Sequence, residues 1–167
     1  MAKKSRRAKQ TPVETLRNKK AAMRKSAGRK HGGRGKEVWP EITTANMDAI
    51  LRFLPLLEDD GFKPGQMVWK RGEMPFYNLS ADATALEQAL CANGWIVPFP
   101  WVDWKEGRRY FDDPTALAEA DMQTLRRLFT TIVRKDRFCE GFLGSMLETG
   151  FITALLRRLK EIREALP

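Results

Sequence analysis

Residues 121–134 read DMQTLRRLFTTIVR, and this stretch decides the fold. Its large apolar side chains recur at the spacing of an α-helix: Leu125, Leu128, Phe129, Ile132 and Val133. Asp121 stands before the first of them, where a carboxylate can accept hydrogen bonds from the first N–H groups of a helix. The pattern therefore predicts an amphipathic helix that begins after Asp121, ends near Arg134 and buries one stripe in a hydrophobic core.

Segments on both sides of this helix show the same period. It predicts further helices over residues 44–57, 80–91, 113–119, 139–147 and 153–165. Thr44 and Ser80 are the expected N-caps of the first two, because their hydroxyls can bond free N–H groups. Pro55 should kink or shorten the first helix, since proline lacks the N–H that a helix interior needs. Gly150 should separate the last two.

Extended structure is limited to short pieces. Residues 66–69 and 76–79 are two strand candidates around a turn, and together they predict a small hairpin. Residues 95–104 carry four aromatic residues, and Pro98 and Pro100 exclude a regular central strand. The sequence thus predicts a mainly α fold, a compact bundle of about five to six helices with at most one short β-hairpin.

The aromatic crossing of residues 95–104 allows two interpretations. Its rings can stack on single-stranded bases, or they can pack on the helices. Base-stacking surfaces interleave rings with cations, and this stretch has none before Lys105. Packing in the core is therefore the favoured interpretation.

Charge divides the chain into two parts. Residues 1–36 hold 14 Lys or Arg and one acid, Glu14, for a net charge of +13 (14 − 1). Residues 37–167 hold 16 basic and 20 acidic residues, for a net charge of −4 (16 − 20). The first part contains few large apolar side chains and cannot bury enough surface to offset the entropy of ordering. We therefore predict a disordered basic arm over residues 1–36 and a helical domain over residues 37–167.

The arm has the composition of segments that lie along a phosphate backbone. Its candidate phosphate-binding residues are all its cations: Lys3, Lys4, Arg6, Arg7, Lys9, Arg17, Lys19, Lys20, Arg24, Lys25, Arg29, Lys30, Arg34 and Lys36. Such contacts would not read the base sequence, and they do not distinguish DNA from RNA. A solubilising tail, an anionic membrane surface and an acidic protein partner are the alternatives.

Familiar catalytic and metal-binding patterns are missing from the sequence. The single histidine, His31, lies in the arm, and the two cysteines, Cys91 and Cys139, are far apart and lack zinc-ligand spacing. No glycine-rich nucleotide loop is present, and no stretch approaches the roughly 18 apolar residues of a membrane helix. We expect free thiols, no metal and no cofactor. A cytoplasmic location is the default, and a non-enzymatic role is favoured while carboxylate acid–base chemistry stays open.

One dense polar cluster stands at the junction between two predicted helices. It comprises Arg134, Lys135, Asp136, Arg137, Phe138, Cys139, Glu140 and Gly141, followed by Glu148. A structural interpretation is that the charges cap the two helix ends and pair with one another. A functional interpretation is a pocket for an anion, a peptide or a nucleotide.

The domain resembles a known family. The segments at residues 53–59, 93–104, 131–141 and 148–159 are similar to those of the prokaryotic domain-of-unknown-function family 6508, over roughly residues 45–163. The string RKDRFCEG at residues 134–141 is the most specific part of the likeness. The resemblance implies that Arg134, Asp136, Arg137, Cys139, Glu140 and Glu148 form a family signature at this corner. It implies no activity, and the arm lies outside it.

Three functional hypotheses follow. The first is a non-enzymatic accessory or regulatory protein that binds nucleic acid non-specifically through the arm and engages a partner through the domain. The second is an enzyme or small-anion binder at the corner of residues 134–148, with Arg134 and Arg137 holding an anion and Glu140 or Glu148 as base. The third is a protein-interaction module without nucleic acid, with Trp101 and Trp104 exposed as anchors.

Overall fold

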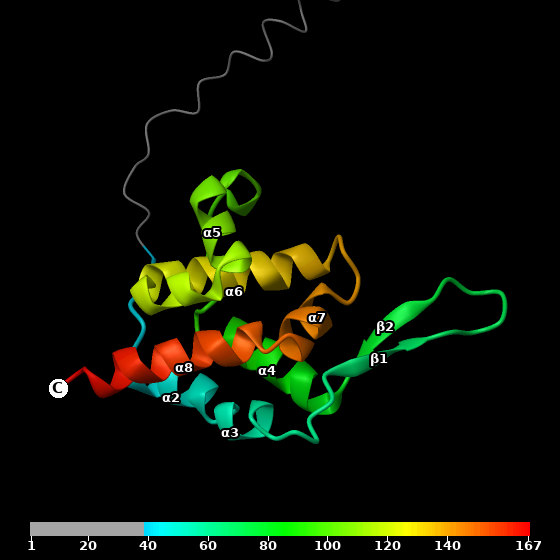
Figure 1. Ribbon diagram of the computed structural model, residues 1–167, viewed down its shortest axis with the longest axis horizontal. Helices are drawn as coiled ribbons and strands as arrows, with labels where there is room; N and C mark the ends of the chain where they lie inside the picture. The colour runs from blue at the N-terminus through cyan, green and yellow to red at the C-terminus, as the bar shows by residue number, and fades with distance from the viewer. Residues whose placement is uncertain (1–38) are drawn as a thin grey trace, which may run out of the picture. The chain divides into compact units, whose positions relative to one another are not determined.

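The computed structural model describes residues 39–167, so the predicted basic arm lies outside the described residues. The domain is mainly helical with one short hairpin in the described part of the chain, which confirms the predicted fold class. Two long helices form its centre: α6 (Met122–Asp136) and α8 (Phe151–Glu164). Figure 1 shows α6 beside α8, with α2 (Thr44–Leu51), α4 (Ala81–Ala92) and α7 (Phe142–Glu148) around them.

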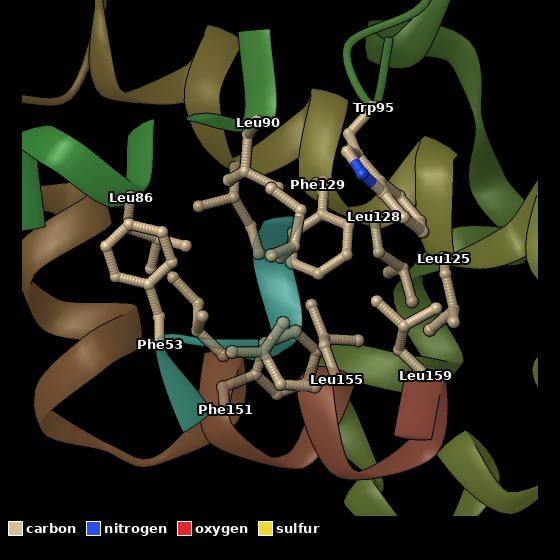
Figure 2. Close-up of a cluster of buried hydrophobic side chains, with 14 of the residues drawn as sticks. Phe53, Leu86, Leu90, Trp95, Leu125, Leu128, Phe129, Phe151, Leu155 and Leu159 are labelled. Atoms are coloured by element: carbon tan, nitrogen blue, oxygen red, sulfur yellow. The ribbon is translucent and has the colours of Figure 1, made fainter. Parts of the chain in front are cut away.

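The core lies between α4, α6 and α8. All five apolar residues of the predicted stripe on α6 are buried, and Asp121 caps the helix by accepting the Thr124 N–H at 2.8 Å. Figure 2 shows Leu155 and Leu159 of α8 pointing toward the α6 side chains, with Leu86 and Leu90 of α4 beside them. Burying a leucine or phenylalanine side chain contributes about 1.5–3 kcal/mol, so this cluster accounts for much of the stability.

The first predicted helix is two helices. It divides into α2 and the single-turn α3 (Leu54–Leu57), because Pro55 occupies the first turn of α3, where its missing N–H is tolerated. The N-cap is Thr43, not Thr44 as predicted. Thr43 is extended and accepts the Asn46 N–H, while Asn46 Oδ1 accepts the Thr43 N–H at 3.0 Å, which is a capping box.

The rings of the aromatic crossing pack against the rest of the domain, as predicted. Trp95 is fully buried, packs edge-on against Phe129 at 5.6 Å and donates its Nε1–H to the Asn46 carbonyl. Arg126 is buried below this segment and donates to the carbonyls of Pro40 and Gly94. The rings therefore face protein, and the segment ends in a 3₁₀ turn over Trp101–Asp103.

Trp101 and Trp104 are partly buried, which corrects the expectation of two exposed anchors. Trp104 packs edge-on against Phe99, and its ring lies so close to Gly107 that a Cβ there would overlap it. Trp101 lies 6.1 Å from the ring of Phe138, which is the exposed partner of the pair. These tryptophans are framework residues rather than free anchors.

Short elements between α4 and α6 were predicted in part. A 3₁₀ helix over Pro114–Glu119 follows the N-cap Asp113, as the sequence indicated. The preceding 3₁₀ turn over Lys105–Gly107 and α5 (Arg108–Asp112) have no clear sequence period because each is too short to show one. Within residues 39–167, none of the helices is both long enough and apolar enough to cross a membrane.

The hairpin comprises β1 (Gly65–Val68) and β2 (Phe76–Leu79), one residue earlier in β1 than predicted. The strands are antiparallel, with Gly65 opposite Leu79 and Met67 opposite Tyr77. In Figure 1 the hairpin projects away from the helices at the end of the domain where α7 lies. Its base is joined to the domain by Ser80, whose N–H bonds the Pro64 carbonyl and whose hydroxyl caps α4.

Candidate functional site

The corner of residues 134–148 begins at the C-terminus of α6. Arg134 and Lys135 lie in its last turn, where cations interact favourably with the free carbonyls. Asp136 accepts the Leu143 N–H at 2.8 Å and thereby caps the start of α7. Helix α7 starts at Phe142, three residues later than predicted, because Gly141 before it adopts a left-handed conformation with φ of 77°. Asp136 thus joins the end of α6 to the start of α7.

The two glutamates of the corner bind one residue, Tyr77 of β2. The Tyr77 N–H donates to Glu140 Oε1 at 2.8 Å, and its hydroxyl donates to Glu148 Oε1 at 3.1 Å. The ring lies over Gly141 and Gly144, and a Cβ at Gly144 would overlap it. The corner therefore holds the hairpin in place, and Glu140 and Glu148 already have a partner in the folded domain.

The chemistry of Tyr77 suits this role. Burial, the hydrogen bond to Glu148 and the nearby carboxylate of Asp136 raise its pKa to about 12. The phenol therefore stays protonated and keeps donating its hydrogen bond at neutral pH. Sequence reasoning missed Tyr77, because it is separated from Glu140 by 63 positions. The pair of glycines at 141 and 144, which leaves room for a ring, was the one signal in the sequence.

Helix α4 also contributes to the corner. Burial raises the pKa of Glu87, with Asp136 adding to the rise and Arg137 opposing it. Burial and the charge of Glu87 likewise raise the pKa of the Cys91 thiol. A raised pKa keeps a thiol in its weakly nucleophilic form, so Cys91 is poorly suited to attack a substrate. Both cysteines are free thiols, as expected.

The arginines of the corner are placed differently from one another. The side chain of Arg134 is half-buried, and its Nε has no hydrogen-bond partner among the described residues. Arg137 is exposed and acts on Glu87 and Cys91 through its charge. The structure thus brings Arg137, Asp136, Glu140 and Glu148 around the hairpin base and α4, with Cys139 on the exposed loop.

A cavity of about 350 Å³ lies beside the corner, between α5, α6, α7 and α8. Its lining residues are Phe111, Lys135, Phe142, Met146, Thr149, Gly150, Phe151 and Ala154. Lys135 is the one charged residue of the corner among them, and its Nζ lies 4.0 Å from the centre of the Phe142 ring. Neither Arg134 nor Arg137 lines this cavity. No group of three or more His, Cys, Asp or Glu in residues 39–167 is placed to hold a metal ion.

The comparisons with known proteins give one match. The profile of a family of unknown function, DUF6508, matches residues 42–165, which is well over half of the chain. The chain belongs to this family. The matched range covers every described helix and both strands of the DUF6508 domain, while the basic arm lies outside it. No curated protein and no solved structure matches the chain.

Proposed function

We propose that this DUF6508 protein is a non-enzymatic accessory or regulatory protein of the cytoplasm. Its arm, residues 1–36, binds nucleic acid without sequence preference, and its helical domain, from residue 37 onward, engages a protein partner. The observation that carries the proposal is the separation of charge, +13 in the arm against −4 in the rest of the chain. Nucleic acid attracts such an arm because cations on it release counterions from the phosphates.

The pairing of the domain's own cations supports the assignment of nucleic-acid binding to the arm. Several are paired with carboxylates: Arg163 with Asp48 at 3.1 Å, Arg157 with Glu58 at 2.8 Å, Arg158 with Glu161 at 2.8 Å and Arg109 with Glu119 at 3.4 Å. Arg126 is buried on backbone carbonyls. A surface of this kind offers little to a phosphate backbone, so binding should depend on the arm.

Fluorescence anisotropy with labelled duplex DNA, single-stranded DNA and RNA tests the proposal. If about six phosphates are neutralised, the logarithm of affinity should fall with the logarithm of salt concentration at a slope near −5. Changing Arg17, Lys19, Lys20, Arg24 and Lys25 to glutamine should weaken binding and flatten this slope. Changing Lys63, Lys105 and Arg108 of the domain to glutamine is the control and should change little. Unaltered binding by the arm variant would contradict the proposal.

A second candidate function is the binding of a small apolar anion in the cavity beside Lys135. The observation favouring it is an ammonium group at the edge of a cavity lined by Phe111, Phe142 and Phe151. The volume lies within the range of small-molecule sites. A thermal-shift screen with aromatic and aliphatic carboxylates should then raise Tm, and Lys135→Gln should abolish that rise. If no carboxylate shifts Tm, or the variant responds equally, the cavity is not an anion site.

A further inference from the structure

The two edges of the hairpin are not equivalent. Ser80 donates its N–H to the Pro64 carbonyl at 2.8 Å, so these residues form a hydrogen-bonded pair. Hydrogen-bonded and non-hydrogen-bonded pairs alternate along an antiparallel ladder. Met67 and Tyr77, three positions further along, are therefore a non-hydrogen-bonded pair, and their backbone N–H and C=O groups point outward from the hairpin.

On the β2 edge one of the two outward groups of Tyr77, its N–H, has a partner. Glu140 accepts the Tyr77 N–H at 2.8 Å, and the corner covers this side of the strand. On the β1 edge the outward N–H and C=O of Met67 have no hydrogen-bond partner within residues 39–167. A new strand can therefore be added beside β1 and not beside β2.

Between Pro64 and Lys70, which flank it, the β1 edge lacks the features that keep strand edges apart. Proteins protect such edges with charged side chains, prolines or bulges. The segment from Gly65 to Trp69 carries no charge, and its large side chains are exposed, Met67 by 45% and Trp69 by 76%. Met74, beyond the turn, is 87% exposed. Two strands alone are only marginally stable, and pairing with a further strand would stabilise them.

We propose that β1 pairs antiparallel with β1 of a second copy of this chain, about a two-fold axis at Met67. This inference rests on the proposed function and identifies the protein partner of the domain as a second copy of the chain. Pairing of identical strands is isologous, so Met67 lies opposite Met67 of the second copy and Gly65 opposite its Trp69. The outward N–H and C=O groups of Met67 then bond each other across the axis. An uncharged strand faces its own copy without like-charge repulsion.

The charged residues beyond the two ends of β1 also favour a second copy as the partner. In this register Lys70 and Arg71 of each hairpin tip fall opposite Pro64 and Lys63, the residues that precede β1 in the other copy. The segment at residues 58–63 carries Glu58, Asp59, Asp60 and Lys63, for a net charge of −2, whereas the tip at residues 70–75 carries Lys70, Arg71 and Glu73, for a net charge of +1. The tip of one copy and the segment before β1 of the other thus have opposite net charges, on both sides of the axis. A second copy therefore offers complementary charge as well as complementary backbone.

Light scattering and sedimentation of the full chain test the proposal, in reducing buffer and after removal of nucleic acid, so that neither disulfides nor bridging by nucleic acid contribute. Wild-type protein should form dimers with rising concentration, between about 1 µM and 1 mM, as a small interface allows. Met67→Lys alone and Met67→Glu alone should each weaken the dimer about tenfold or more, since each places like charges opposite one another. An equal mixture of the two should restore it.

Gln66 supplies matched controls. It is exposed on the same strand, but its side chain lies on the other face and its backbone groups point toward β2. Gln66→Lys and Gln66→Glu should therefore keep the wild-type dimer, and circular dichroism should show all variants folded. A wild-type protein that stays monomeric over the whole range overturns the proposal. So does a dimer that survives Met67→Lys, or a mixture of the charge variants that fails to associate. None of these outcomes depends on whether the arm binds nucleic acid.

Discussion

The side chains of the core between α6 and α8 are covered by other residues of the same chain, whereas the hairpin carries large apolar side chains that are exposed to solvent. Leu125, Leu128 and Leu155 are fully buried, while Trp69 and Met74 are mostly exposed. The first region is held by many equivalent apolar contacts and the second by a few specific ones around Tyr77. The difference indicates that the core determines stability and that the hairpin is available for another molecule.

The largest effect should follow from opening the core. Leu155→Ala removes a fully buried side chain from the centre of α8 and leaves a cavity that the neighbouring helices fill only in part. We expect the free energy of unfolding to fall by about 2–5 kcal/mol, measured by urea denaturation. Leu166→Ala, at an exposed position after the end of α8, is the control and should change it by less than about 0.5 kcal/mol. Equal effects would show that the core does not carry the stability.

The second-largest effect on the free energy of unfolding should come from the contact between the corner and the hairpin. Gly144→Ala places a Cβ where the Tyr77 ring lies, so the ring must move and its bond to Glu148 is lost. We expect a loss of about 1–3 kcal/mol in the free energy of unfolding, the usual range for overpacking. The double variant Tyr77→Ala, Gly144→Ala tests the cause. In that background the added methyl group should be neutral or stabilising, because alanine favours a helix interior. Simple additivity of the two changes would contradict the predicted contact.

Sequence and structure agree best where the interactions are local. The stripe from Leu125 to Val133 and the caps at Ser80 and Asp121 act within a few residues, so their period and residue type are visible in the chain. The choice of Thr43 over Thr44 as cap depends on which residue adopts the extended conformation, and both residue types are equally suitable. Tyr77 and Glu140 meet only because the fold brings them together, and no local pattern predicts that.

The same reasoning explains why the corner was ambiguous. Arg134, Asp136 and Glu140 have the residue types of an anion pocket and equally those of capped helix ends. The hydrogen bonds of Asp136 to Leu143 and of Glu140 to Tyr77 decide the geometry, and neither partner is a charged residue. A search for opposite charges in the sequence could not find them.

A smaller effect should come from the Tyr77 hydroxyl. Tyr77→Phe removes the hydrogen bond to Glu148, whose exposed carboxylate is then solvated, so the free energy of unfolding should fall by about 1 kcal/mol. The pH dependence provides a second measurement. Because the folded-state pKa of about 12 lies above the ordinary value of 10, the unfolded chain loses this proton first as pH rises.

The stabilisation linked to the Tyr77 proton is therefore complete below about pH 10 and is lost between about pH 10 and pH 12. In Tyr77→Phe this contribution to the loss of stability at high pH should be missing. The other groups that titrate in this range contribute equally in both proteins. Near-ultraviolet absorbance titration should show a late-ionising tyrosine component in the wild type, and that component should be missing in the variant. If the two proteins lose stability in parallel through this range, Tyr77 is not held as a donor.

The smallest effect on stability should come from the hairpin tip, and it sharpens the contrast between the two regions. Trp69 is 76% exposed, so Trp69→Ser removes little buried area from the single chain and should change the free energy of unfolding by less than about 0.5 kcal/mol. The measurement is made at a concentration where the protein is monomeric. At high concentration the same variant should unfold more easily than the wild type, since dimerisation stabilises only a chain that can pair. If Trp69→Ser leaves the stability of the monomer unchanged but lowers that of the dimer, the hairpin exposes its apolar face for association. If the monomer itself loses stability as Leu155→Ala does, the hairpin belongs to the core, and the distinction between the two regions fails.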